Sequence, residues 1–253
     1  DSSSHNEHSN LTLIAKNQLG YKNLIKLISK SQIVGKTSGI PVIETEWLAE
    51  HSEGLIALSG GFRGHIGKAV LDTNHDLFLK RIKYFQKIFK EDFILEISRI
   101  NRPQEDIYND YILSKAGELG LPVVASNEVR FIDKEDYEAH ETRVCIQKGE
   151  VLSDARRTRS YFEDQYFLSP EEMYEKFKDI PEVLSNAYEL GKKCNLEIET
   201  GIYVLPDFKT PLNKSAADHL IEISKNNLKE KTKDISDDDK VKYADRLDFE
   251  LDV

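Results

Sequence analysis

The sequence predicts an α/β fold, because short strand-like runs alternate with segments of helical periodicity along the first half of the chain. Apolar residues at helical spacing follow most of these runs. Such alternation is typical of a mostly parallel sheet covered by helices, arranged as a barrel or as a doubly wound sheet. With 253 residues, 39% of them hydrophobic, the chain is long enough to bury a core.

The expected elements follow one another in a regular order. Strands are predicted at residues 11–15, 55–58, 93–97 and 121–126. Apolar residues at helical spacing predict helices near Leu24, near Ile66, at 77–89 and at 103–119. Because the carboxyl ends of parallel strands carry function, we look for chemistry in four segments: residues 16–17, 59–64, 98–102 and 127–130.

Helices dominate the pattern beyond residue 133. We expect them within 133–144, 170–177, 181–194 and 215–253, the last of which is strongly charged. The densest basic patch lies in a polar loop between the first two and comprises Arg156, Arg157 and Arg159. This patch is either an ordinary solvated loop or a contact for phosphate or for a partner.

The composition excludes several classes of protein. The formal net charge of -10 gives no overall attraction to a phosphate backbone, so a nucleic-acid contact would need a local basic patch. The two cysteines, Cys145 and Cys194, indicate neither a disulfide framework nor a cysteine-based zinc site. No apolar run approaches the roughly 20 residues that span a bilayer, and no signal peptide opens the chain. We expect a cytoplasmic protein with no membrane partner.

Common catalytic motifs are absent, since no GxGxxG, Walker loop, HExxH or GxSxG pattern occurs. Glu96 and Glu128 both lie at predicted strand ends, where a close pair of carboxylates could perform acid–base chemistry or hold a metal. His140 could complete such a site from a predicted helix, although a partly buried structural histidine is the more common role in such a place.

Five blocks of sequence occur in one order along the chain: NLTLIAKNQLGYKNLIKLISK at 10–30, EGLIALSGGFRGH at 53–65, EISRINRP at 96–103, GLPVVASNEVRFIDKEDYEAHET at 120–142 and YVLPDFK at 203–209. In order and spacing these blocks resemble the polymerase-and-histidinol-phosphatase (PHP) domain of bacterial DNA polymerase III alpha subunits, of the proteobacterial type. The resemblance covers nearly the whole chain, which makes it more specific than any single motif.

The resemblance implies a distorted β/α (TIM-like) barrel that lacks its N-terminal strands and is followed by a helical run-up to the polymerase palm. We accordingly expect the PHP domain at residues 1–212, without its earliest motifs, and a truncated start of the palm-proximal region at 213–253. In this family the catalytic aspartates for nucleotide transfer lie in the palm. We therefore expect no DNA synthesis by this chain, and whether it is an enzyme at all stays open.

The resemblance also implies a metal site that is degenerate here. Family members that keep the site have a histidine where this chain has Asn10, and often a cysteine at the position of Gly61. They have a histidine in place of Ile100, and an Asp-x-His pattern in place of Glu128 to Arg130. Isoleucine cannot ligate a metal, and a protonated arginine repels one. We expect no catalytic residue, no metal and no cofactor in this chain, whereas the parent polymerase uses Mg.

Two roles for the degenerate site stay open. A salt bridge between Arg130 and Glu128 could fill the old metal site and support the fold. Alternatively, Glu96, Glu128 and His140 could form the remainder of a metal-dependent phosphoesterase or pyrophosphatase, against which Ile100 and Arg130 count.

The resemblance implies a partner protein as well. In proteobacterial relatives the PHP domain docks the proofreading exonuclease subunit and supports the remainder of the alpha subunit, through which it meets DNA. A docking surface needs exposed apolar side chains with a polar rim. The aromatic candidates are Tyr161, Phe162, Tyr166 and Phe167, for each of which packing in the core is an equally good explanation.

Overall fold

The computed structural model describes most of the chain: residues 8–37, 39–154, 156–203, 208–211 and 214–252. The chain divides into two compact units, Asp1–Ile198 and Glu199–Val253, which we describe separately. The predicted domain boundary between residues 212 and 213 lies outside the described residues, as does most of the YVLPDFK block. Within the part that is described, no helix is long and apolar enough to cross a membrane.

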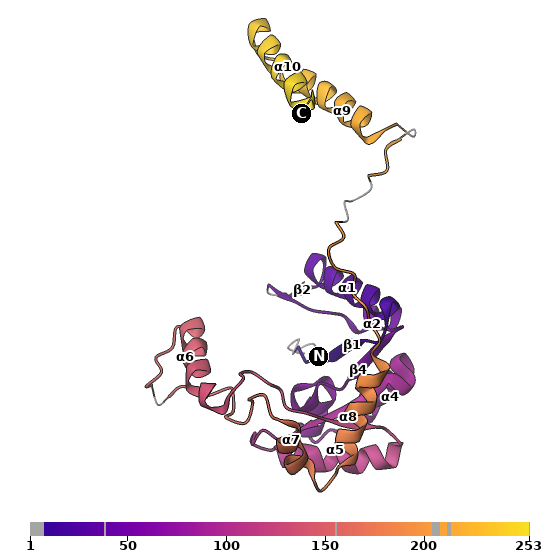
Figure 1. Ribbon diagram of the computed structural model, residues 1–253, viewed down its shortest axis with the longest axis vertical. Helices are drawn as coiled ribbons and strands as arrows, with labels where there is room; N and C mark the ends of the chain where they lie inside the picture. The colour runs from indigo at the N-terminus through magenta and orange to yellow at the C-terminus, as the bar shows by residue number, and fades with distance from the viewer. Residues whose placement is uncertain (1–7, 38, 155, 204–207, 212–213, 253) are drawn as a thin grey trace, which may run out of the picture. The chain divides into compact units, whose positions relative to one another are not determined.

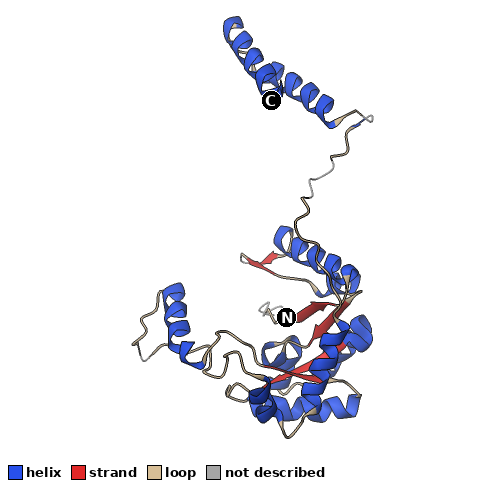
Figure 2. Cartoon of the chain, viewed as in Figure 1, coloured by secondary structure: helices blue, strands red, loops and turns tan. Residues whose placement is uncertain are grey.

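A four-stranded sheet forms the centre of the first unit. Its strands, β1 (Thr12–Ala15), β4 (Leu55–Leu58), β5 (Phe93–Ser98) and β6 (Val123–Ser126), lie in the order β1-β4-β5-β6. All four lie where the sequence predicts strands, and the α/β class is confirmed. Among the described residues these strands form an open sheet (Figure 2).

One strand runs against the expected direction. Strands β4, β5 and β6 are parallel, as predicted, but β1 is antiparallel to β4, with Thr12 opposite Leu58 and Ala15 opposite Leu55. The carboxyl end of β1 therefore lies at the opposite edge of the sheet from the other three. Lys16 pairs there with Asp92, just before β5, so our expectation that residues 16–17 contribute to a site at the carboxyl edge is wrong.

Four helices cover one face of the sheet, and the main hydrophobic core lies between them and this face. They are α1 (Gln18–Ile33), α3 (His65–Leu71), α4 (His75–Phe89) and α5 (Glu105–Leu119), all at predicted positions. Gly120 ends α5 in the left-handed conformation that glycine adopts without strain. The sequence did not predict the short helix α2 (Thr45–Glu50) or the two-stranded pairing of β2 (Lys36–Thr37) with β3 (Ile40–Pro41).

The opposite face of the sheet is covered by α8 (Glu182–Lys193). Side chains along a strand alternate between the two faces, so Phe93 and Leu95 belong to the main core while Ile94 packs in the cluster that includes Ala187 and Leu190 of α8. By the same alternation Glu96 lies on the α8 face of the sheet. A carboxylate is thus directed to the side where a second, smaller cluster is buried.

After β6 the chain leaves the sheet and returns to it. Helix α6 (Tyr137–Lys148) is set apart from the sheet, with long loops on both sides, and α7 (Pro170–Phe177) leads back to α8 (Figure 1). In the second unit, α9 (Ala216–Lys231) and α10 (Asp237–Asp252) confirm the predicted helical character. An ion pair of 2.9 Å between Lys225 and Asp248 joins these two helices.

A close approach between α1 and the turn before β4 generates a stability prediction. A Cβ atom on Gly20 would lie 1.9 Å from the carbonyl oxygen of Gly54, which is held in place by a hydrogen bond of 2.8 Å from the Lys16 amide. We expect Gly20→Ala to lower the free energy of unfolding by about 1–3 kcal/mol, because backbone atoms must move apart. Urea unfolding followed by circular dichroism measures this change.

Gly117→Ala is the matched control. Gly117 lies within α5 and has open space where its Cβ would be, so alanine should leave stability unchanged or raise it by up to about 1 kcal/mol. Equal stability of the two variants would contradict the role assigned to the contact between Gly20 and Gly54.

Candidate functional site

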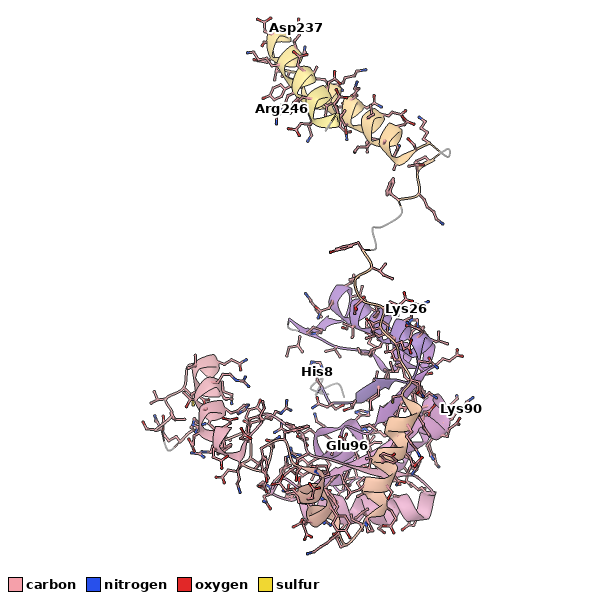
Figure 3. All side chains as sticks on the ribbon, viewed as in Figure 1. His8, Lys26, Lys90, Glu96, Asp237 and Arg246 are labelled. Carbon is pink, nitrogen blue, oxygen red and sulfur yellow. The ribbon has the colours of Figure 1, made fainter. Side chains whose placement is uncertain are left out.

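A pocket of about 250 Å³ lies at the carboxyl edge of the sheet. Because β1 is antiparallel, the residues before it reach this same edge. The backbone amide of Asn10 donates a hydrogen bond of 3.3 Å to the carbonyl oxygen of Arg63. Figure 3 labels Glu96, which contributes to the pocket from β5. The pocket is lined by Asn10, Thr12, Gly60, Arg63, Glu96, Glu128, Val129 and Arg130.

Glu96 is a buried carboxylate, only 9% exposed. Its backbone is fixed on both sides, since its amide donates to Ser59 Oγ at 2.9 Å and its carbonyl accepts from the Tyr108 hydroxyl at 2.8 Å. Burial raises the pKa of the Glu96 carboxyl and the nearby charge of Glu128 raises it further, while the polar groups of Ser126 and the Gly60 backbone lower it. Glu96 therefore holds its proton to a higher pH than an exposed glutamate.

Glu128 is paired with a buried arginine. Its carboxylate accepts from Arg102 Nη2 at 2.7 Å, and the Arg102 side chain is only 5% exposed. The guanidinium of Arg102 also lies over two aromatic rings, 4.9 Å from the centre of Phe62 and 5.6 Å from that of Phe162. The hypothesis that Arg130 pairs with Glu128 is thus wrong, because Glu128 pairs with Arg102 instead. Arg102 ends the 98–102 segment in which we looked for chemistry.

Arg130 lines the pocket without that ion pair. Its guanidinium lies 5.6 Å from the ring centre of Tyr161, and its amide donates to the carbonyl oxygen of Gln165 at 2.7 Å. The Gln165 side chain in turn donates to the carbonyl oxygen of Glu128 at 3.0 Å. Gln165 is buried and holds the corner that carries both charged side chains. Nothing in the sequence singled it out, because Glu128 and Arg130, the two site residues that it holds, lie more than thirty residues away.

The two remaining positions of the degenerate metal site, Gly61 and Ile100, are both buried. Gly61 adjoins Glu96 and is buried, with a positive φ of 57°. Ile100 is fully buried in place of a ligand, and its amide donates to Glu105 at 2.7 Å. Ser98 donates to the same carboxylate at 2.9 Å, so Glu105 fixes the segment that leads to Arg102. Burial raises the pKa of the Glu105 carboxyl, although these hydrogen bonds oppose the shift.

His140 does not join the two glutamates. It lies on α6 with its ring centre 5.5 Å from Phe131 and 4.6 Å from Tyr161, and it is not among the residues that line the pocket. Burial, and then the charge of Arg143, lower its pKa. The structure therefore brings Glu96 and Glu128 together but not the set of Glu96, Glu128 and His140. The described residues contain no group of three or more histidine, cysteine or acidic side chains placed to hold a metal.

The basic loop is engaged internally. Arg157 forms a buried ion pair with Glu141 of α6. Arg159 lies 3.4 Å from Glu138 on the same helix, and Arg156 pairs with Asp154 at 2.8 Å within the loop. Each of the three arginines thus faces a carboxylate, but the side chain of Arg156 is 90% exposed, and a contact of this loop with phosphate or a partner stays a prediction. Arg157 and Arg159 attach the loop to α6, whereas the pair of Arg156 with Asp154 stays within the loop.

The raised pKa of Glu96 predicts a pH dependence of stability. The unfolded chain ionises this carboxyl near its ordinary pKa of 4.5, whereas the folded state keeps the proton to higher pH, so stability is lost as pH rises above 4.5. We expect Glu96→Gln to raise the midpoint of thermal unfolding at pH 7.5 more than at pH 4.5. Thermal scans at both values measure the difference.

Glu163→Gln is the control for this prediction, because Glu163 is exposed. It should change the midpoint little, and by similar amounts at both pH values. A gain for Glu96→Gln that is the same at both pH values would show that ionisation of Glu96 in the folded state does not oppose folding.

Comparison with known proteins identifies the family. A model of the PHP domain family matches residues 1–100. The DNA polymerase III subunit alpha of Pseudomonas aeruginosa is 42% identical over 252 residues, that of Vibrio cholerae 44% over 253, and that of Escherichia coli K12 41% over 253. These alignments cover 97–98% of this chain and 22% of each relative.

The chain thus spans about a fifth of the length of these curated relatives. Its mixed α/β architecture, with strand and helix alternating, is consistent with part of the distorted barrel that the resemblance implies. Residues 1–100 therefore match the PHP domain family, and nearly the whole length of the chain is homologous to bacterial DNA polymerase III alpha subunits.

Proposed function

We propose that this chain serves a replicative DNA polymerase as a non-catalytic PHP domain, which supports the polymerase and docks its proofreading exonuclease subunit. One observation carries the proposal: the ion pair between buried Arg102 and half-buried Glu128 lies at the pocket where the resemblance implies a metal in other family members. A carboxylate that already neutralises a buried arginine is a poor ligand for a cation. The pocket is therefore suited to a structural role.

The other side chains at the pocket support the same proposal. Arg130 adds a permanent positive charge to the lining, which raises the free energy of a bound cation. Glu96 is the remaining carboxylate, and its raised pKa favours the protonated form, which ligates poorly. Ile100 supplies no donor at all. These residues do not fit a metal centre, so we assign no chemical step to one.

The wider setting is part of the proposal. The relatives are named as DNA polymerase III subunit alpha, and this chain covers 22% of their length. We place DNA synthesis, with its Mg, in the remainder of an alpha subunit and in the cytoplasm. This chain would then meet DNA through that remainder, in agreement with its net charge of -10 and with a basic loop whose arginines face carboxylates.

A second candidate function keeps some support. Glu96 and Glu128 share one pocket, which is the minimum that a residual phosphoesterase or pyrophosphatase would need. The position of His140 against Phe131 and Tyr161 counts against this candidate. A metal analysis separates the two functions.

We expect the purified chain to contain much less than one transition-metal ion per molecule after dialysis against zinc and manganese, because Arg102 and Arg130 oppose a cation at the pocket. Mass spectrometry of the metal content measures this, with Glu128→Ala as the reference. A stoichiometric metal that disappears in Glu128→Ala would overturn the non-catalytic assignment and favour the phosphoesterase.

We expect the proofreading exonuclease subunit from the same cell to bind this chain saturably in a calorimetric titration. The physical requirement is an exposed apolar surface with a polar rim, and Phe167 meets it with 71% of its surface exposed. If the heats of the titration equal those of diluting the exonuclease alone, and circular dichroism shows that the chain is folded, the docking role is ruled out.

A further inference from the structure

A groove on the first unit exposes two large apolar side chains side by side. Ile132 and Phe167 are each 71% exposed, and the Phe167 amide donates to the carbonyl oxygen of Ile132 at 3.1 Å. Both line a cavity of about 880 Å³, hereafter the Ile132–Phe167 groove. Its other lining residues are Asp133, Lys134, Glu135, Tyr166, Leu168, Ser169, Pro170, Glu172 and Met173.

The floor of the groove is preformed by contacts beneath it. Phe131 pairs with Tyr166 in a parallel β-bridge, and both Phe131 and Leu168 are buried. The side chain of Asn127 donates to the carbonyl oxygen of Tyr166 at 2.6 Å, and the Tyr166 hydroxyl donates to Glu172 at 2.7 Å. Side chains that rise from such a floor lose little conformational freedom when a partner covers them, which favours binding.

The rim of the groove is acidic. Asp133, Glu135 and Glu172 line it against a single basic residue, Lys134. An apolar floor with a negative rim is complementary to a segment in which apolar side chains are flanked by lysine or arginine. It disfavours an acidic segment and offers nothing to a phosphate backbone.

We propose that the Ile132–Phe167 groove is the docking site of a short basic and apolar segment of a partner protein. The identity of the partner rests on the proposed function, under which it is the exonuclease subunit. Of the four aromatic residues that the sequence offered as docking candidates, Phe167 lies open in the groove and Tyr166 lines it. Tyr161 and Phe162 are engaged by His140 and Arg102.

Two double variants test the apolar part of the groove. We expect Ile132→Ser with Phe167→Ser to weaken binding of the exonuclease subunit by at least about 10-fold, because both apolar contacts are lost. The matched control is Ile107→Ser with Ile146→Ser, which removes two apolar side chains, 65% and 78% exposed, that lie outside the groove. It should bind as the unaltered chain does. Calorimetry measures the affinities, and thermal unfolding confirms that both variants fold.

Opposite changes of charge at neighbouring positions test the rim. Glu135→Lys should weaken binding several-fold and Lys134→Glu should strengthen it, and both effects should shrink in high salt. If the groove variants bind the exonuclease subunit as tightly as the unaltered chain does, the groove is not the docking site, and the docking role itself stays intact. Failure of the unaltered chain to bind the exonuclease would remove the docking role, and the groove with it.

Discussion

The ion pair that compensates the buried charge of Arg102 is the interaction on which the pocket and its surroundings depend. A guanidinium removed from water is costly unless a partner compensates it, and Glu128 provides one hydrogen-bonded carboxylate at 2.7 Å. The rings of Phe62 and Phe162 lie near the same group and supply cation–π attraction. Truncating either partner of such a pair typically costs about 3–5 kcal/mol, so these two residues constrain each other.

This ion pair joins two parts of the first unit that lie far apart in the sequence. Arg102 follows β5, Glu128 follows β6, and Phe162 comes from the loop that returns from α6. Gln165 adds hydrogen bonds from that loop to the backbone of Glu128 and Arg130. The same loop continues to Phe167 at the proposed groove. The segment that fixes the backbone of Glu128 and Arg130 at the pocket therefore also presents the apolar surface of the proposed groove.

The direction of β1 explains why the pocket has this composition. Because β1 is antiparallel to β4, Asn10 reaches the carboxyl edge while Lys16 lies at the opposite one. The pocket is consequently lined by the uncharged side chain of Asn10 and not by the ammonium group of Lys16. The family resemblance had already matched Asn10 to a ligand position, whereas the parallel-sheet rule had pointed to residues 16–17.

The sequence by itself determined the α/β class, the positions of all four sheet strands and the family, because each depends on local periodicity or on ordered blocks of residues. It also marked Glu96, Glu128 and His140 as a possible residual site, and Glu128 and Arg130 as positions of a degenerate metal site. Only the tertiary structure decided that Arg102 and not Arg130 pairs with Glu128, that His140 packs among aromatic rings, and that Arg157 is buried against Glu141. Strand direction and ion-pair partners depend on contacts between segments distant in the sequence, which local patterns do not encode.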